Sequence, residues 1–316
     1  MSNSGTKLFH SIKFTLRDSI RRAIPFVITQ YEWAIGLYTG KSPLDLVPIE
    51  KPENPVLTLK DVTDIEAKFI ADPFLVHHGN QFYLFFEAWD GPTAKGVLAF
   101  ADSPNGLDWT YRQVILAEPF HLSYPHVFFW HGQAYMTPES QTNSVCLYRA
   151  EEFPFKWVLE TTLIEREALA DPTPFYYHDH WWMFVGTVAN DTLYLYHADT
   201  PLGPWIEHPM SPLLTGEFRY SRPGGRVFSY EGHLYRVGQD GLLRYGHQLH
   251  LFEITELTTT TYKEKIVAPS PWLAPGGEAW NSHGMHQMDV LSLENGQYLA
   301  CVDGYRRLRR FRNNFK

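Results

Sequence analysis

The sequence predicts an all-β fold, a five-bladed β-propeller, because one segment recurs five times along the chain. Three copies align without a gap, at residues 71–87 (ADPFLVHHGNQFYLFFE), 123–139 (SYPHVFFWHGQAYMTPE) and 170–186 (ADPTPFYYHDHWWMFVG). A fourth copy at 221–238 needs one extra residue, and a degenerate fifth copy begins at residue 283. The copies start roughly fifty residues apart, a period typical of propeller blades. The 316 residues, 44% hydrophobic and 20% charged, suffice for one large domain with a sizeable core.

Each copy has the pattern of a β-hairpin, in which an apolar run, a tight turn and an aromatic-rich run follow one another. The turns are expected at 78–80, 131–132, 178–179, 231–232 and 294–296. Further strand pairs lie between the copies, for example at 96–111 and 193–208, so that each repeat supplies four strands. One such sheet cannot bury both faces alone, whereas five around an axis can. A β-sandwich with chance similarity between its segments is the alternative.

The N-terminal segment, residues 1–31, is expected to form an amphipathic helix and a lead-in to the first strand. Apolar residues recur at helical spacing, at Leu8, Ile12, Leu16, Ile20 and Ile24, before Pro25 ends the pattern. This basic helix either packs its apolar stripe on the propeller or lies on an anionic membrane. Residues 32–38 (EWAIGLY) have strand character, and we expect them to pair with the last blade and close a propeller that spans 32–305.

The C-terminal segment, residues 306–316, is strongly basic and is expected to be a solvated tail, with contact to phosphates or anionic lipids as the alternative.

The formal charge of the whole chain is −8, which argues against a nucleic-acid partner. Its two cysteines indicate neither a disulfide framework nor a cysteine zinc site. No stretch has the pattern of a secretory signal or a membrane span, so we expect a cytoplasmic protein.

The hairpin geometry predicts which polar residues meet. Because the second strand of a hairpin returns to the end where the first began, position two and the last position of each copy lie at one end of the axis. Four carboxylates, one aromatic residue, one arginine and two histidines are expected to converge there: Asp72, Glu87, Glu139, Asp171, Tyr124, Arg222, His283 and His286. The segment that leads to Gln239 and Asp240 ends at the same place.

Converging carboxylates predict acid/base chemistry, because like charges a few ångströms apart raise the pKa of at least one carboxyl group. A protonated acid beside an ionised one is the arrangement used in glycoside hydrolysis. In the alternative, the aspartates cap strands and the glutamates form structural salt bridges with Arg222. A carboxyl separation of about 5–10 Å between Asp72 and Glu139 would favour hydrolysis, and direct salt bridges to Arg222 would favour a structural role. Trp89 and Tyr124 are the aromatic residues expected to stack on a sugar ring.

The repeat openings resemble known families. The ADP openings at 71 and 170 and the stretch LYLYHADTPLGPW at 193–205 resemble the five-bladed propellers of glycoside hydrolase family 43 and its relatives in families 32 and 68. The set ADPF, SYPHVF, ADPTPF and SRPGGRVF is more specifically similar to the propeller domain at the N-terminus of plant glucosamine inositolphosphorylceramide transferase and its bacterial stand-alone relatives. In the plant family the glycosyl-transferring domain is a separate segment of the chain.

The resemblance to family 43 implies roles for single residues. Asp72 would be the catalytic base, Asp171 the carboxylate that tunes the acid, and His286 a residue that holds a central water or a structural calcium ion. The acid of that family is a glutamate of the fourth blade, where this sequence has Arg222 and the pair Gly224-Gly225. Glu139 is therefore the substitute acid, with Glu87 next.

Two functions follow from the sequence. The first is a carbohydrate-active enzyme of the glycoside hydrolase type, acting on a glycosidic or related bond with Asp72 as base and Glu139 as acid. The second is a non-catalytic glycan-binding or glycolipid-binding propeller that assists a glycosyltransferase. In either case the ligand is a sugar or a sugar-containing small molecule, and no cofactor is required.

Overall fold

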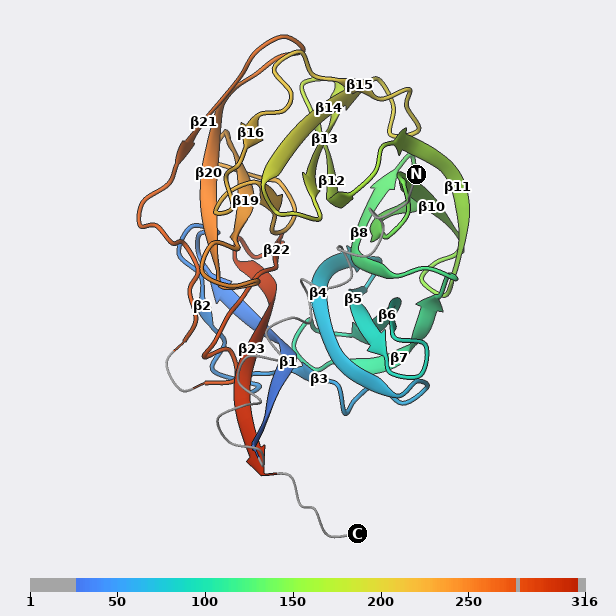
Figure 1. Ribbon diagram of the computed structural model, residues 1–316, viewed down its shortest axis with the longest axis vertical. Helices are drawn as coiled ribbons and strands as arrows, with labels where there is room; N and C mark the ends of the chain where they lie inside the picture. Colours follow the sequence, from blue (N-terminus) through green and yellow to red (C-terminus); the bar gives the residue numbers. More distant parts are fainter. Residues whose placement is uncertain (1–26, 277–278, 312–316) are drawn as a thin grey trace, which may run out of the picture. The chain divides into compact units, whose positions relative to one another are not determined.

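The computed structural model describes residues 27–276 and 279–311, and within them the chain consists of β-strands and loops (Figure 1). Two units are distinguished: residues 33–306 form one, and residues 1–32 with 307–316 form the other. The predicted N-terminal helix, with its stripe from Leu8 to Ile24, lies outside the described residues. No helix in the described part is long and apolar enough to cross a membrane.

The first three blades are antiparallel sheets built from consecutive strands. Blade one comprises β4 (Ala67–His78), β5 (Gln81–Asp90), β6 (Lys95–Ser103) and β7 (Thr110–Leu116). Blade two comprises β8 (Leu122–Trp130), β9 (Gln133–Ser140), β10 (Ser144–Glu152) and β11 (Lys156–Glu165). Blade three comprises β12 (Leu169–Tyr177), β13 (His180–Thr187), β14 (Thr192–Ala198) and β15 (Ile206–Glu207), and β16 (Leu214–Thr215) also pairs with β14.

Blade four comprises β17 (Arg222–Pro223), β18 (Phe228–Tyr230), β19 (His233–Asp240), β20 (Gln248–Leu257) and β21 (Tyr262–Ile266). Blade five joins the two ends of the propeller, because its order is β2 (Val47–Pro48), β1 (Val27–Gly40), β23 (Tyr298–Phe311) and β22 (Met288–Ser292), with β3 (Leu57–Thr58) also on β1. The five sheets lie around a common centre in Figure 1. The predicted five-bladed propeller and its closure by the segment after residue 32 are confirmed.

The basic C-terminal segment differs from the prediction. Strand β23 continues through Phe311, so residues 306–311 are strand and not tail. The consecutive residues Arg306 and Arg307 are both exposed, so neither face of β23 is buried at these positions.

The five copies form the inner hairpins, as predicted. Three of their turns have both central residues at positive φ, at 131–132, 178–179 and 231–232. This is the geometry of two-residue type I′ turns, which matches the twist of the paired strands. The wedges between blades are filled by apolar side chains. Phe85 of blade one, for example, meets Trp157 of blade two edge-to-face at 6.0 Å.

One irregularity recurs in the first strands of blades one, two and three, where the pairing register shifts at residues 71–74, 123–126 and 170–173. At each shift the residue before proline has a left-handed backbone, with φ of 55° at Asp72, 52° at Tyr124 and 50° at Asp171. Proline has no backbone N–H, so it does not donate to the pairing of the strands. A β-bulge changes the usual alternation of side chains between the two faces of a strand. The bulges therefore aim three repeat-equivalent side chains at one end of the centre, here called the bulge end.

Candidate functional site

Arg222 is the centre of a buried ion cluster at the bulge end. Its Nε donates to Asp171 Oδ2 at 2.5 Å, and its Nη2 donates to Asp171 Oδ1 at 3.1 Å and to Glu139 Oε2 at 2.6 Å. Its Nη1 donates to Asn190 Oδ1 at 2.8 Å. All three nitrogens of the guanidinium are thus engaged by protein atoms. Of the two arrangements left open by the sequence, the structure has direct salt bridges to Arg222.

Backbone geometry makes room for this cluster. In the third copy Gly186 occupies the position that is glutamate in the first two copies, and a Cβ there would lie 3.2 Å from Arg222 Cα and 2.9 Å from Pro223 Cδ. The amide of Gln239, which pairs with Arg222 across β17 and β19, donates to Asp171 Oδ2 at 2.9 Å. Asp171 consequently accepts donors from two side chains of blade four.

A second cluster joins blades five, one and two through Asp72. The backbone N–H of Asp72 donates to Asp303 Oδ2 at 3.1 Å, and the N–H of Tyr124 donates to Asp72 Oδ2 at 3.2 Å. His286 Nδ1 lies 2.6 Å from Asp303 Oδ2, and His286 Nε2 lies 3.6 Å from Asp72 Oδ1. Each carboxylate thus binds a backbone amide of the next blade, which gives Asp72 and Asp303 a structural role.

Asp72, His286 and Asp303 also form the one group in the described residues whose ligand atoms, within 4.8 Å of one another, could hold a metal ion. Calcium prefers six to eight oxygen ligands. Here Asp303 already accepts the N–H groups of Asp72, His286 and Gln287, and it pairs with the imidazole. The group therefore fits an imidazole–carboxylate pair better than a calcium site.

Burial and mutual repulsion control protonation at the bulge end. Burial raises the pKa of Asp72, against the opposing effect of His286, and raises the pKa of Asp171 well above its usual range despite Arg222. Burial opposes a charged imidazole at His286, but the carboxylates of Asp303 and Asp72 outweigh it and raise the pKa of this histidine. For Asp72 and Asp171 burial is thus the main cause of the raised pKa, and the neighbouring carboxylates add to it.

Tyr124 connects its own blade two to blades one, three and four. Its hydroxyl is 2.8 Å from Thr173 Oγ1 and accepts the N–H of Gly225 at 3.0 Å, while its ring packs edge-on against Phe74 at 4.8 Å. The side chain is fully buried. Its observed contacts are those of a connecting residue rather than those of a sugar-stacking platform.

The other predicted residues lie around this centre in different settings. Glu87 is buried on β5, with its Oε1 3.7 Å from His121 Nε2. Trp89 is half-buried and stacks on Phe69 at 5.5 Å. His283 is half-buried, and its Nδ1 lies 3.0 Å from Ser282 Oγ. His286 belongs to the cluster around Asp72, whereas the backbone N–H of His283 donates to the carbonyl of Tyr305 at 2.9 Å.

Three functional residues were missed from the sequence. Asp303 occupies the position of the fifth copy that is equivalent to Glu87 and Glu139, so the repeat contained a signal for it. Asn190 follows the last strand of the third hairpin by three residues, and no repeat position marks it. His121 precedes the second copy and is likewise outside the template.

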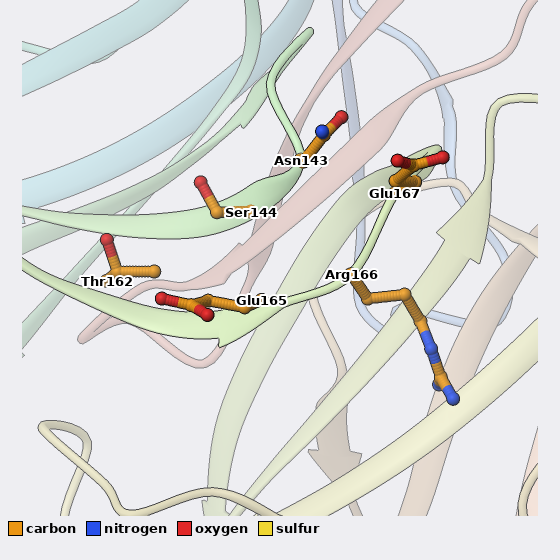
Figure 2. A pocket seen from close by; sticks show the side chains of 6 residues that line it. All are labelled: Asn143, Ser144, Thr162, Glu165, Arg166 and Glu167. Atoms are coloured by element: carbon orange, nitrogen blue, oxygen red, sulfur yellow. The ribbon is translucent and has the colours of Figure 1, made fainter.

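A polar cleft lies on the outer strands of blade two and the segment that leads from them to blade three. Its volume is about 430 Å³, and it is lined by Asn143, Ser144, Thr162, Glu165, Arg166 and Glu167 (Figure 2). Figure 2 shows the Arg166 side chain pointing away from Thr162 and Glu165; its Nη1 bonds the Tyr196 hydroxyl at 2.6 Å.

Comparisons with known proteins match this fold and most of the chain. The family model described as glucosamine inositolphosphorylceramide transferase 1, N-terminal, matches residues 29–305. Curated proteins named glucosamine inositolphosphorylceramide transferase 1 are 38% identical in rice (Oryza sativa subsp. japonica) and 35% identical in Arabidopsis thaliana, each over 298 residues and 87% of this chain. The chain spans only 40% and 39% of the length of these relatives.

Solved structures of glycoside hydrolases share the fold. The α-L-arabinanase of Cellvibrio cellulosa complexed with arabinohexaose superposes with a TM-score of 0.56 at 13% identity, covering 75% of this chain and 91% of that one. A thermostable family-43 glycoside hydrolase superposes with a TM-score of 0.55 at 15% identity, covering 78% and 95%. At such identities the likeness concerns the fold. The resemblances to both families stated from the sequence are confirmed at that level.

Proposed function

Because the chain belongs to the family of the N-terminal domain of glucosamine inositolphosphorylceramide transferase 1, we propose that its propeller binds an amino-sugar headgroup without cleaving it and presents it to a glycosyltransferase. The names of the curated relatives contain an amino sugar and an inositol phosphate lipid. The proposal assigns the recognition of the sugar to this part of the protein and the transfer to another.

The excess of negative charge at the bulge end carries the proposal. Among the described residues, the ion pairs of the four carboxylates Asp72, Glu139, Asp171 and Asp303 are with the two cations Arg222 and His286. When all these groups are ionised, the negative charges exceed the positive ones by two. An ammonium group close to these carboxylates would reduce the repulsion between them. Its attraction to them would be strong because a buried site contains little water to screen the charges. Glucosamine supplies such an ammonium on a sugar ring.

Asp72 is the residue that we expect to accept this ammonium. Its Oδ2 is occupied by the N–H of Tyr124, whereas its Oδ1 lies 3.6 Å from His286 Nε2, beyond hydrogen-bond distance. Within the described residues Oδ1 has no hydrogen-bond donor. A charge-assisted hydrogen bond to this oxygen would therefore displace no hydrogen bond from within the described residues.

Hydrolysis is the second candidate, and the shared fold together with the raised pKa of Asp72 favours it. The salt bridge between Glu139 and Arg222 argues against hydrolysis. A general acid must carry a proton, but a guanidinium 2.6 Å away favours the ionised carboxylate and occupies its Oε2. Glu139 would have to leave Arg222 before it could protonate a leaving oxygen. The same salt bridge leaves a binding function undisturbed.

Calorimetric titration separates the two candidates. We expect glucosamine to bind more tightly than glucose and N-acetylglucosamine, which lack the ammonium, and Asp72→Asn to weaken glucosamine binding about tenfold or more. Asp108→Asn, an exposed carboxylate between β6 and β7, is the matched control. In parallel, a panel of nitrophenyl glycosides tests cleavage. Turnover that Asp72→Asn abolishes would establish the hydrolase instead, and equal binding of the three sugars would refute the ammonium site.

A further inference from the structure

Three loops at the bulge end carry exposed apolar side chains. They follow β13, precede β17 and connect β19 to β20. Their apolar residues are Val188, Phe218, Leu242 and Leu243, here called the mouth patch, and these residues are 40%, 42%, 47% and 78% exposed. Isolated exposed apolar residues are normal, but a contiguous group on a soluble surface usually marks an interaction site.

Backbone hydrogen bonds join the three loops that carry the mouth patch. The N–H of Gly241, next to Leu242, donates to the carbonyl of Phe218 at 2.9 Å. The N–H of Glu217, next to Phe218, donates to the carbonyl of Asp191 at 3.1 Å. These bonds fasten the three loops together side by side.

The mouth patch borders the ion cluster directly. Asn190, in the same loop as Val188, accepts the Arg222 Nη1 hydrogen bond at 2.8 Å. Phe218 lies four residues before Arg222 in the chain, and Leu242 lies two residues after Asp240, at the end of β19 that pairs with Arg222. A surface that covers the mouth patch would therefore also face the entrance to the proposed headgroup site.

Exposed charges of the same loops are basic. Arg219 follows Phe218, and Arg244 follows Leu243, and both are exposed. The acidic side chains of these loops are engaged within the protein: Asp191 by the hydroxyls of Thr187 and Thr192, Asp240 by the N–H of Leu242 and by Gln248 and His250, and Glu217 by the N–H of Arg219. The surface thus offers protruding apolar tips beside two available arginines.

We propose that the mouth patch docks on a lipid bilayer, with Leu242 and Leu243 inserted among the acyl chains and Arg219 and Arg244 bound to lipid phosphates. Apolar side chains flanked by cations are the pattern of peripheral attachment to anionic membranes. The inference rests on the proposed function in one respect: a headgroup attached to ceramide stays at the membrane, so the end that admits the headgroup must face the bilayer. A bilayer is favoured over a protein partner because the most exposed residue, Leu243, stands at a loop tip beside arginine.

Co-sedimentation with vesicles tests the docking surface. The full chain is incubated with vesicles of phosphatidylcholine alone and of equal parts phosphatidylcholine and phosphatidylserine. We expect Leu243→Asp to lower the partition coefficient about tenfold or more, since burial of one leucine is worth that much. Leu159→Asp, an exposed leucine on the outer strand β11, should bind as the unmodified protein does. Arg244→Glu should weaken binding to the anionic vesicles most, whereas Lys156→Glu, at the opposite end of blade two, should not.

Several outcomes would overturn the inference. If the unmodified protein does not sediment with either vesicle, or if Leu243→Asp and Leu159→Asp lose binding equally, the mouth patch is not a membrane surface. A dimer in light scattering that Leu243→Asp abolishes would identify a second copy as the occupant. Glucosamine titration distinguishes this failure from failure of the proposed function, because Leu243→Asp should leave the affinity for the free sugar unchanged.

Discussion

Replacement of Arg222 by methionine tests whether the cation holds the bulge end together. Methionine keeps a long side chain but removes the charge and every hydrogen bond to Asp171, Glu139 and Asn190. The two buried carboxylates, 1% and 2% exposed, then lack a counter-charge. Breaking a buried ion pair in this way costs about 3–5 kcal/mol. In a domain of this size each kcal/mol lowers Tm by about 2–4 °C, so we expect a loss of about 6–20 °C.

The pH dependence of this loss identifies its cause. Burial raises the pKa of Asp171 in the intact protein, and Arg222 opposes that rise. Without Arg222 the pKa of folded Asp171 rises further above that of the unfolded chain. A group with a raised folded pKa favours folding fully below its unfolded pKa, and this contribution is lost as pH rises through the folded pKa. The loss of stability that Arg222→Met causes, relative to the intact protein, should therefore be larger at about pH 8 than at about pH 5.

Thermal and urea unfolding followed by circular dichroism measure both effects. Arg149→Met, which removes a surface pair with Glu160 at 2.8 Å, is the control and should leave Tm unchanged. The triple variant Arg222→Met, Asp171→Asn, Glu139→Gln should recover much of the loss, since no buried charge is then unpaired. If Arg222→Met unfolds like the intact protein, or if its deficit is equal at both pH values, the charge argument is refuted.

Three further predictions follow from single contacts. Gly225→Ala should destabilise the propeller by about 3 kcal/mol or more, because φ is +144° and a Cβ would lie 1.7 Å from Met288 O; Gly132→Ala, with open space at φ +77°, should cost about 1 kcal/mol in the same melts. Tyr124→Phe should cost about 1–3 kcal/mol in urea titrations, as the N–H of Gly225 loses its acceptor. Glucosamine affinity should fall as pH falls through the raised pKa of Asp72, and a flat calorimetric profile would contradict Asp72 as the acceptor.

The blades were predictable because their signals are local. Alternating apolar residues and turns such as His131-Gly132 specify each hairpin within about fifteen residues of sequence, and repetition then specifies the ring. Repeat equivalence also placed Asp72, Tyr124 and Asp171 at one end. The left-handed bulge that aims them could not be read from the sequence, because aspartate or tyrosine before proline is usually extended.

The pairings within the site depended on contacts between distant segments. Glu139 and Arg222 are separated by 83 positions, and either could have met another partner at the bulge end. Gly225 was seen in the sequence only as a departure from the hydrolase pattern, whereas the structure shows why glycine is required there: its backbone contacts Met288 of blade five and donates to Tyr124. Such close approaches are properties of the assembled ring, so no local pattern reports them.

The fourth blade separates this site from that of a hydrolase on the same scaffold. In the family 43 pattern this blade contributes a proton donor, whereas here it contributes Arg222, and Gly186 of the neighbouring blade leaves the space that the arginine backbone requires. The guanidinium then binds both carboxylates that could have served as acid or as its tuning partner, Glu139 and Asp171. An acid must release its proton and regain it in every cycle, so Glu139 would first have to leave Arg222. A binding site has the opposite requirement, because charges that are held in place before the ligand arrives need no reorganisation when an ammonium binds.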